Sequence, residues 1–164
     1  MSKRSVDKKQ EEFTRKNPLA EHSMEFVANV NGVDFINDSI AIKVESTWNS
    51  LNACSGNVIL LIGGIDSRND YSMLEELVRK KVKAVITLGT DNSKIIQTFL
   101  KTGKEISAAI SLQDAVEKAA AIAKAGDTVL FSPSCPSYHP FDNYKNRGND
   151  FKMEVRIFSE KNSR

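Results

Sequence analysis

The chain has 164 residues, a length that fits one domain able to bury a core without metal or disulfide cross-links. Its two cysteines, Cys54 and Cys135, are too few and too far apart for a disulfide framework, and no CxxC pair or histidine cluster indicates a metal site. No segment is apolar over the length of a transmembrane helix or a signal peptide, so we expect a cytoplasmic protein with free thiols.

The formal net charge of +2 is concentrated at the N-terminus. Residues 1–16 contain six basic and three acidic side chains, a surplus of +3 that leaves the rest of the chain near −1. Such a polar, charged segment is typical of a solvated terminus. We therefore predict a disordered basic leader at residues 1–18 and one domain at residues 19–162, with neither nucleic acid nor membrane as a partner.

The domain is predicted to begin with a β-hairpin. Strand-like segments at 25–30 and 33–36 flank Asn31-Gly32, a preferred two-residue turn. The hairpin is expected to add antiparallel strands to one edge of a sheet. Residues 44–51 then carry apolar side chains at helical spacing and predict a helix that leads to the first buried strand.

After residue 56, strand-like and helix-like patterns alternate, as they do in βαβ units. The apolar run 58–62 ends at Gly63-Gly64 and is typical of a strand buried on both faces. Ser111 and Asp114 resemble a capping box at the start of a helix. The expected strands are 58–62, 84–88, 106–110 and 128–131, and the expected helices include 74–78, 95–100, 112–123 and 151–158. The fold class is therefore α/β, a three-layer, Rossmann-like and mostly parallel sheet with an N-terminal antiparallel hairpin.

Three polar or glycine-rich segments follow predicted strands, namely Asn37-Asp38-Ser39, residues 63–70 and residues 132–148. In open parallel sheets, ligands bind beyond the carboxyl ends of the strands. Glycines permit a close backbone approach, and Ser and Asn side chains supply directional hydrogen bonds. The same residue types also cap helices and form turns, so a ligand site and a purely structural role both stay open here.

Nucleotide-binding and hydrolase motifs are absent from the sequence. GxxxxGK[ST] does not occur, and the only Gly-Lys pair, Gly103-Lys104, precedes a predicted strand rather than a helix. There is no dinucleotide fingerprint either. Ser134 and Cys135 lie near His139, but no strand-to-helix elbow presents a nucleophile. The chain alone is therefore not expected to hold a triphosphate or to act as a hydrolase.

The most specific functional signal is a series of short motifs that extends over nearly all of the domain. They are Glu21-His22, Val30-Asn31-Gly32, Phe35-Ile36-Asn37-Asp38-Ser39, Ser46-Thr47, Gly63-Gly64, Leu130-Phe131-Ser132-Pro133-Ser134-Cys135, Ser137, Phe141 and Arg147-Gly148-Asn149-Asp150-Phe151. On these residues, the chain from about Glu21 to Phe158 resembles the C-terminal domain of the Mur ligases, specifically of those that add D-glutamate to UDP-N-acetylmuramoyl-L-alanine.

The resemblance implies one part of a three-domain reaction in the synthesis of peptidoglycan precursors. In that family, the first domain holds the UDP-sugar, the central domain carries the P-loop, and the C-terminal domain brings the amino acid. ATP phosphorylates a substrate carboxyl group, and the amine of D-glutamate attacks the acyl phosphate. ATP and Mg²⁺ are therefore expected as cofactors only if the chain acts with a central P-loop domain, and the N-terminal and central domains are the expected partners in trans.

The resemblance also assigns the site residues. The family uses cations and hydroxyls at the strand ends to hold the two carboxylates of the amino acid. The expected substrate-binding residues are Ser137, Tyr138, Tyr144, Ser67, Arg68 and Lys43, and the expected cofactor-binding residues are Asn37, Asp38 and Ser39. No catalytic residue and no metal ligand are expected in this chain.

The sequence departs from the family at its cationic positions. Ser23 stands where the resemblance expects an arginine, Ile40 and Ser67 stand where it expects lysines, and only Ser137 is plainly retained. Lys43 and Arg68 lie nearby, but a shift of one residue re-aims a side chain. Hydrogen bonds to charged groups contribute ~1.5 to 3 kcal/mol each, so the loss of two weakens D-glutamate binding by ~3 to 6 kcal/mol.

Three functions follow as hypotheses. The preferred one is a divergent C-terminal domain of a D-glutamate-adding Mur ligase that keeps its fold but is inactive as an isolated chain. The second is the D-glutamate-binding half of a split ligase that works with a P-loop partner. The third is a non-catalytic module that binds another small amino acid, a different small molecule or a protein on the same scaffold.

Overall fold

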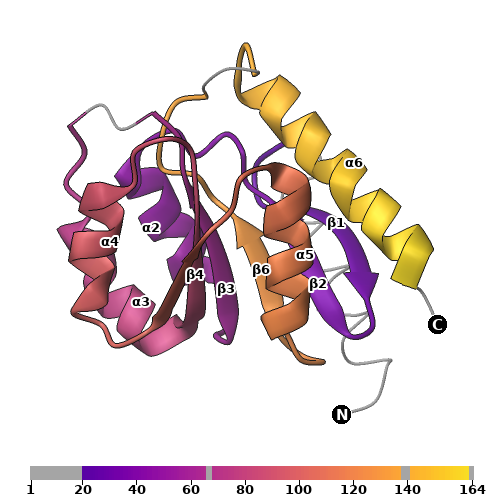
Figure 1. Ribbon diagram of the computed structural model, residues 1–164, viewed down its shortest axis with the longest axis horizontal. Helices are drawn as coiled ribbons and strands as arrows, with labels where there is room; N and C mark the ends of the chain where they lie inside the picture. The colour runs from indigo at the N-terminus through magenta and orange to yellow at the C-terminus, as the bar shows by residue number, and fades with distance from the viewer. Residues whose placement is uncertain (1–19, 66–67, 138–140, 163–164) are drawn as a thin grey trace.

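A six-stranded sheet lies between two layers of helices in the computed structural model, which describes residues 20–65, 68–137 and 141–162 (Figure 1). The predicted leader at 1–18 lies outside the described residues. The strand order is β1-β2-β6-β3-β4-β5. The strands are β1 (Glu25–Val30), β2 (Val33–Asn37), β3 (Val58–Gly63), β4 (Val82–Leu88), β5 (Glu105–Ala108) and β6 (Thr128–Phe131).

The N-terminal hairpin forms as predicted, but its pairing with the rest of the sheet differs from the expectation. Asn31 and Gly32 both have positive φ, at 52° and 86°, as a tight hairpin turn with the strand twist requires. β1 and β2 are antiparallel to each other, but β2 pairs in parallel with β6, so β1 alone runs against the other strands of the sheet. The expectation of two antiparallel strands was therefore wrong for β2. A local hairpin pattern contains no information about the partner on the other edge of β2.

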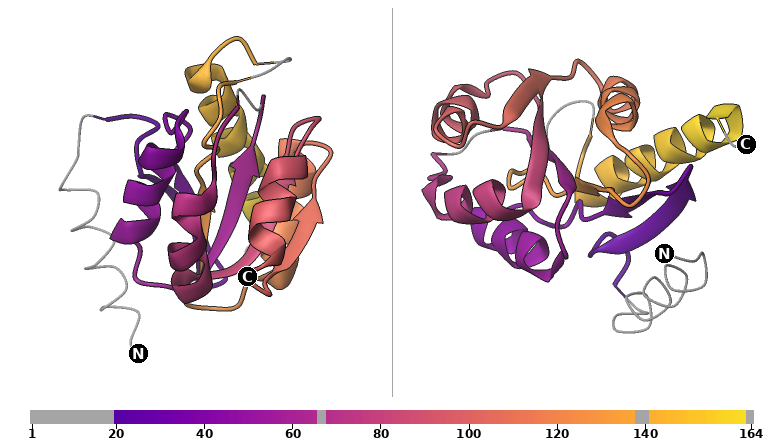
Figure 2. Two further views of the ribbon diagram at one scale, coloured as in Figure 1. Left: turned by 90° about the vertical axis from the view of Figure 1, so that its left-hand side faces the viewer. Right: turned by 90° about the horizontal axis from the view of Figure 1, so that it is seen from below.

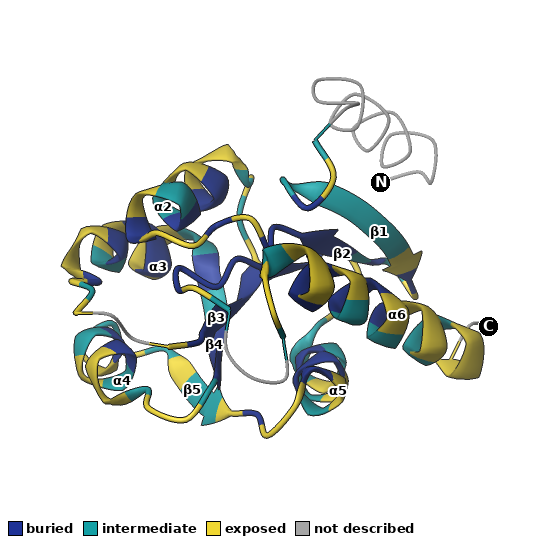
Figure 3. Ribbon diagram, turned by 90° about the horizontal axis from the view of Figure 1, so that it is seen from above, coloured by how far each residue is buried: buried dark blue, intermediate teal, exposed yellow. Residues whose placement is uncertain are grey.

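The helices form the two outer layers of the predicted three-layer arrangement. The helices α2 (Val44–Ala53), α3 (Glu75–Lys81) and α4 (Ser93–Leu100) lie side by side on one face, as Figure 2 shows. The helices α5 (Leu112–Ile122) and α6 (Tyr144–Asn162) cover the other face, and Figure 3 shows both layers end-on. A short 3-10 helix, η1 (Ser72–Leu74), precedes α3.

The central strand β3 explains why both faces of the sheet are covered. Every residue from Val58 to Gly63 is buried. Ile59 and Leu61 join the hydrophobic cluster under α5 and α6, whereas Leu60 and Ile62 join the cluster under α2, α3 and α4. The alternation of side chains along a strand thus divides one continuous apolar run between two cores.

Local signals fix the ends of α5 and β5. Ser111 Oγ accepts a hydrogen bond from the Asp114 amide at 3.1 Å, and Asp114 Oδ2 accepts one from the Ile110 amide at 3.0 Å. The predicted cap is therefore confirmed. The preceding strand stops at Ala108 rather than at residue 110, and Ile110 is 95% exposed in the turn before the cap.

The last helix begins inside the segment that we expected to be a loop. Since α6 starts at Tyr144, the connection after β6 ends at residue 143 instead of 148. A Cβ on Gly148 would lie 2.1 Å from Nδ1 of His22, so the glycine lets α6 pack directly on that ring. This contact with a residue far away in the sequence explains why a glycine occurs in the second turn of α6. No helix among the described residues has the length and apolar character needed to cross a membrane.

Candidate functional site

The segments that follow β2, β3 and β6 meet at one edge of the sheet. Strand β6 lies between β2 and β3. The chain leaves β2 and β3 toward the helices α2 and α3 of one face, and leaves β6 toward α6 of the other (Figure 3). Neighbouring strands whose connections go to opposite faces form the type of position where α/β sheets bind ligands. The candidate site lies at this edge.

The predicted cofactor-binding segment is buried at this edge. The exposed fractions of Asn37, Asp38 and Ser39 are 0%, 2% and 0%. Asn37 Nδ2 lies 2.9 Å from His22 Nδ1 and donates to Glu25 Oε1 at 3.0 Å. The segment does not cap α2, whose N-cap residue is Lys43. Its side chains make hydrogen bonds inside the protein, and a contact with a cofactor stays a prediction.

Asp38 is the centre of a buried polar network. Its Oδ2 accepts hydrogen bonds from Ser50 Oγ at 2.5 Å and from Ser132 Oγ at 2.7 Å, and its Oδ1 accepts one from the Met24 amide at 3.1 Å. Burial raises the pKa of the Asp38 carboxyl from 3.8 to about 6, although these three hydrogen bonds act in the opposite direction. Asp38 thus links β1, β2, α2 and β6.

Thr47 extends the network from α2 to the segment after β6. Ser134 Oγ donates to Thr47 Oγ1 at 2.6 Å, and Ser132 Oγ lies 3.0 Å from the same oxygen. We call the five residues of the network the floor of the site: Asp38, Thr47, Ser50, Ser132 and Ser134. Thr47, Ser50, Ser132 and Ser134 were not among the predicted site residues. The available signal was the polar Thr47 and Ser50 on the inward stripe of the predicted helix.

Arg147, in the first turn of α6, ties the loops of the site together. The residue is 1% exposed, and its guanidinium donates from Nε to Ser39 Oγ at 3.0 Å, from Nη2 to Ser39 O at 2.8 Å and from Nη1 to Cys135 O at 2.9 Å. It also lies 5.9 Å from the centre of the Phe131 ring. One side chain therefore fixes α6 to both the β2 and the β6 connections.

His22, three residues before β1, packs against the start of α6 at the same corner. Its ring packs edge-on against Tyr144, with the ring centres 6.0 Å apart. Burial, and secondly the nearby Lys152, lower the pKa of His22 below 6.5, so the ring is neutral near pH 7. Lys152 Nζ in turn binds Glu21 Oε1 at 2.8 Å and Glu25 Oε2 at 3.2 Å.

The glycine pair at the end of β3 allows this strand to approach β4 closely. Gly63 has φ of 127°, and a Cβ on it would lie 2.1 Å from the Leu88 carbonyl oxygen. The close approach that we expected these glycines to permit is therefore an approach to the end of β4.

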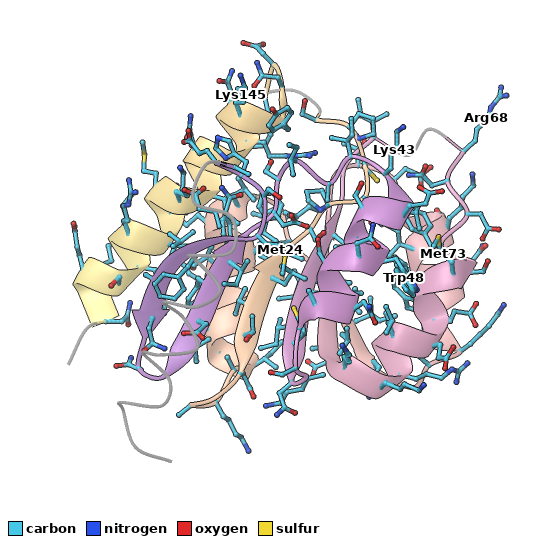
Figure 4. The ribbon with its side chains drawn as sticks, turned by 180° about the vertical axis from the view of Figure 1, so that it is seen from behind. Met24, Lys43, Trp48, Arg68, Met73 and Lys145 are labelled. Carbon is cyan, nitrogen blue, oxygen red and sulfur yellow. The ribbon has the colours of Figure 1, made fainter. Side chains whose placement is uncertain are left out.

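The outer part of the site, which we call the rim, consists of Ser23, Ile40, Ile42, Lys43 and Arg68. Ser23 is half-buried, whereas the other four are exposed. Figure 4 shows Arg68 extending away from the body of the domain and Lys145 at the opposite end of this edge, with Lys43 between them. These cations therefore do not converge on one point.

The remaining predicted site residues are only partly described. Ser137 is half-buried in the segment after β6, and Tyr144 is half-buried against His22. Ser67 and Tyr138 lie outside the described residues. Ser39 Oγ donates to the Tyr144 carbonyl oxygen at 2.8 Å, which places Tyr144 at the same edge, and Figure 4 shows Lys43 there and Arg68 directed outward. Their contacts with a substrate stay predictions. In the described part of the chain, no group of three or more His, Cys, Asp or Glu side chains could hold a metal ion.

Comparison with protein families gives a match over most of the domain. The family described as Mur ligase, glutamate ligase domain, matches residues 23–135. The UDP-N-acetylmuramoylalanine–D-glutamate ligase of Cytophaga hutchinsonii is 46% identical over 136 residues, which is 83% of this chain and 30% of that ligase. The ligase of the same name from Porphyromonas gingivalis is 46% identical over 134 residues, with 82% and 30% covered. The chain thus spans about 30% of the length of these curated relatives.

Solved structures show the same fold at low sequence identity. A murein peptide ligase from Psychrobacter arcticus superposes with a TM-score of 0.57 at 12% identity, over 82% of this chain and 30% of that one. A UDP-N-acetylmuramate-alanine ligase from Thermotoga maritima gives 0.55 at 12% identity, over 85% and 31%. Both support the architecture of the sheet and its helices.

Proposed function

We propose, from the premise that this chain belongs to the family of Mur ligase glutamate ligase domains, that it is the amino-acid-binding domain of a D-glutamate-type Mur ligase. The corresponding reaction forms an amide bond in the synthesis of peptidoglycan precursors. The observation that carries the proposal is the identity of 46% with curated D-glutamate ligases over 83% of this chain. The buried floor, which joins the ends of β2 and β6, supports it as a scaffold for a site at this edge.

The chain is not expected to catalyse the reaction by itself. No GxxxxGK[ST] motif occurs in its 164 residues, and ATP must be held close to the reacting carboxylate for phosphoryl transfer. ATP and Mg²⁺ are therefore proposed cofactors of a complete ligase, bound by a P-loop domain outside these residues. The UDP-sugar would likewise be held by another domain.

D-glutamate is expected to bind weakly to this sequence. Ile40 is 38% exposed at the end of β2, in a position where the resemblance expects a lysine, and Ser23 replaces an expected arginine. Arg68 is directed away from the domain (Figure 4) and does not compensate for these losses. Two missing charged hydrogen bonds weaken binding by ~3 to 6 kcal/mol.

The test restores the expected cations. We predict that the triple variant Ser23→Arg, Ile40→Lys, Ser67→Lys gains D-glutamate affinity by at least ~100-fold over the parent, because each pair of charged hydrogen bonds contributes ~3 kcal/mol or more. Isothermal titration calorimetry measures the gain.

The control adds the same charges at exposed positions elsewhere, as Leu100→Lys, Ile110→Lys and Ala121→Arg. No heat from the restored variant, or equal heat from the control, contradicts the proposal.

A second candidate, compatible with the same buried floor, is the amino-acid-binding half of a split ligase. Its partner would be a chain with a P-loop and the UDP-sugar domain. A mixture with such a partner should form amide from D-glutamate, ATP and UDP-N-acetylmuramoyl-L-alanine. The partner must first prove active when it is joined to the variant domain that carries the three restored cations. If its mixture with the parent chain then shows no turnover, the split-ligase candidate is contradicted.

A further inference from the structure

Four consecutive backbone carbonyl oxygens after β6 each accept a hydrogen bond from a different segment of the chain. The four bonds run from Thr47 Oγ1 to Ser132 O at 3.3 Å, from Gly63 N to Pro133 O at 2.9 Å, from Asn69 Nδ2 to Ser134 O at 3.1 Å and from Arg147 Nη1 to Cys135 O at 2.9 Å. The segment 132–135 is therefore anchored at each of its carbonyl groups, two residues before the predicted substrate-binding residue Ser137.

The backbone at Ser134 shows that these anchors hold an unfavourable conformation. Ser134 is fully buried and has φ of 62°, in the left-handed region that residues with a side chain seldom adopt. Such a conformation persists only where the surrounding contacts fix it. Here, the hydroxyl group donates to Thr47 and the carbonyl oxygen accepts from Asn69. We infer that the loss of either contact allows the segment to relax.

Asn69 differs from the other three donors because it belongs to a connection between elements. Thr47 and Arg147 lie in helices, and Gly63 ends β3. Asn69 is half-buried between β3 and η1, directly after the predicted substrate-binding residue Arg68. Its side chain therefore joins two of the segments in which the sequence predicts ligand contacts.

Tyr71 reinforces the link between these two segments. Asn69 Nδ2 donates to Tyr71 OH at 3.3 Å, and Tyr71 OH lies 3.2 Å from Cys135 Sγ. Both Tyr71 and Cys135 are buried. The segment 68–71 thus contacts the segment 132–135 through two neighbouring side chains, one amide and one phenol.

We propose that Asn69 is a positioning residue of the amino acid site at this edge. By donating to the Ser134 carbonyl oxygen, it holds Ser137 and the segment 68–71 at one fixed separation, without contact to the ligand. An amino acid that bridges both segments needs this separation, because hydrogen bonds weaken steeply when their geometry is lost. The role deepens the proposed function and rests on it, since the ligand, D-glutamate, is taken from that proposal.

The first test measures D-glutamate affinity in the full chain that carries the three restored cations. Asn69→Leu removes the donor at similar side-chain size and should lower the affinity by about 10-fold, the equivalent of one hydrogen bond. Asn69→Gln keeps an amide donor and should stay within about 3-fold of the restored chain. Asn49→Leu, at an exposed position of α2, should change nothing. Isothermal titration calorimetry provides the affinities, and circular dichroism checks that each variant is folded.

The second test needs no ligand and measures how often the anchored segment opens. Cys135 is fully buried beside the Ser134 carbonyl, so a thiol reagent reaches it only when the segment moves. In a Cys54→Ser chain, Asn69→Leu should accelerate native-state labelling of Cys135 by at least about 10-fold, and Asn69→Gln should restore slow labelling. Val116→Ala weakens the hydrophobic cluster under α5 without touching this segment, and should leave the rate near that of the parent.

The results separate local positioning from general stability. Unchanged labelling in Asn69→Leu, or equal acceleration by Val116→Ala, overturns the positioning role. So does unchanged D-glutamate affinity in Asn69→Leu when the restored chain binds D-glutamate. A restored chain that binds no D-glutamate contradicts the proposed function instead, and the labelling rates then decide by themselves whether Asn69 holds the segment.

Discussion

The floor and the rim of the site lie a few residues apart in the sequence but follow different physical constraints. Asp38 is 2% exposed and accepts three hydrogen bonds, whereas Ile40, two residues later, is 38% exposed and makes no polar side-chain contact by its nature. A buried carboxylate needs all of its partners, because each unpaired polar atom costs free energy. An exposed rim side chain has no such requirement. We therefore expect the floor to be needed for the fold, whereas the rim can change with little effect on stability.

The largest expected effect tests whether the inner part of the site is as tightly constrained as its burial indicates. Replacement of Arg147 by methionine removes the hydrogen bonds that its buried guanidinium donates to Ser39 Oγ, Ser39 O and Cys135 O. We expect a loss of about 4 kcal/mol in the free energy of unfolding. Arg156→Met, at an exposed position of the same helix, should change it by less than about 0.5 kcal/mol. Denaturant unfolding curves measure both, and similar losses in the two variants would contradict the role of Arg147.

A smaller effect depends on pH and sharpens the comparison at Asp38. The pKa of the Asp38 carboxyl is about 6 in the folded protein, whereas its ordinary value is 3.8. Between pH 3.8 and about pH 6, the folded state therefore holds a proton on Asp38 that the unfolded state has lost. Its contribution to stability is complete below pH 3.8 and is lost as the pH rises to about 6. We expect the stability of the parent chain relative to the Asp38→Asn variant to rise by about 2 kcal/mol between pH 6 and pH 4.

His22 acts in the opposite direction and must be separated from this effect. Because its pKa is lowered from 6.5, it stabilises the fold above that pH, and the contribution is lost as the pH falls. His22 is present in both proteins, so it cancels in the difference between parent and Asp38→Asn. Urea unfolding at a series of pH values provides the measurement. A difference that does not change with pH would show that Asp38 titrates normally.

The smallest expected effect on stability is at the rim. Ile40→Lys should change the free energy of unfolding by less than about 0.5 kcal/mol, because the side chain is exposed and lies outside both hydrophobic clusters. Thermal unfolding of the parent and the variant measures it. A loss of several kcal/mol in the free energy of unfolding would mean that the rim also stabilises the fold and that its residues cannot be exchanged without cost.

Much of the fold follows from local patterns in the sequence. The apolar run at β3, the hairpin turn at Asn31-Gly32 and the Ser111 cap each depend on neighbouring residues, and each was predicted correctly. The parallel pairing of β2 with β6 was not, since it joins segments far apart in the chain. The start of α6 at Tyr144 was missed for the same reason, because packing on His22 favours a helix through Gly148.

The sheet edge at which the segments after β2, β3 and β6 meet was predictable from the sequence, whereas the contacts among these segments were not. Strand-end topology and the resemblance located the segments around Asn37 and Ser137. The burial of Asp38 could not be foreseen, because its partners Ser50 and Ser132 come from α2 and from the end of β6. Arg147 was recognised only as a motif residue, since its role depends on two carbonyl oxygens whose positions the tertiary structure sets.

The pairing of β2 with β6 has a consequence for the order of events during synthesis. Asp34 pairs with Thr128, so the inner edge of the hairpin stays without its partner until the ribosome has released nearly the whole domain. Such long-range pairing slows folding and leaves an open strand edge that can associate with other nascent chains. We therefore expect truncations that end before β6 to aggregate rather than to accumulate as stable intermediates.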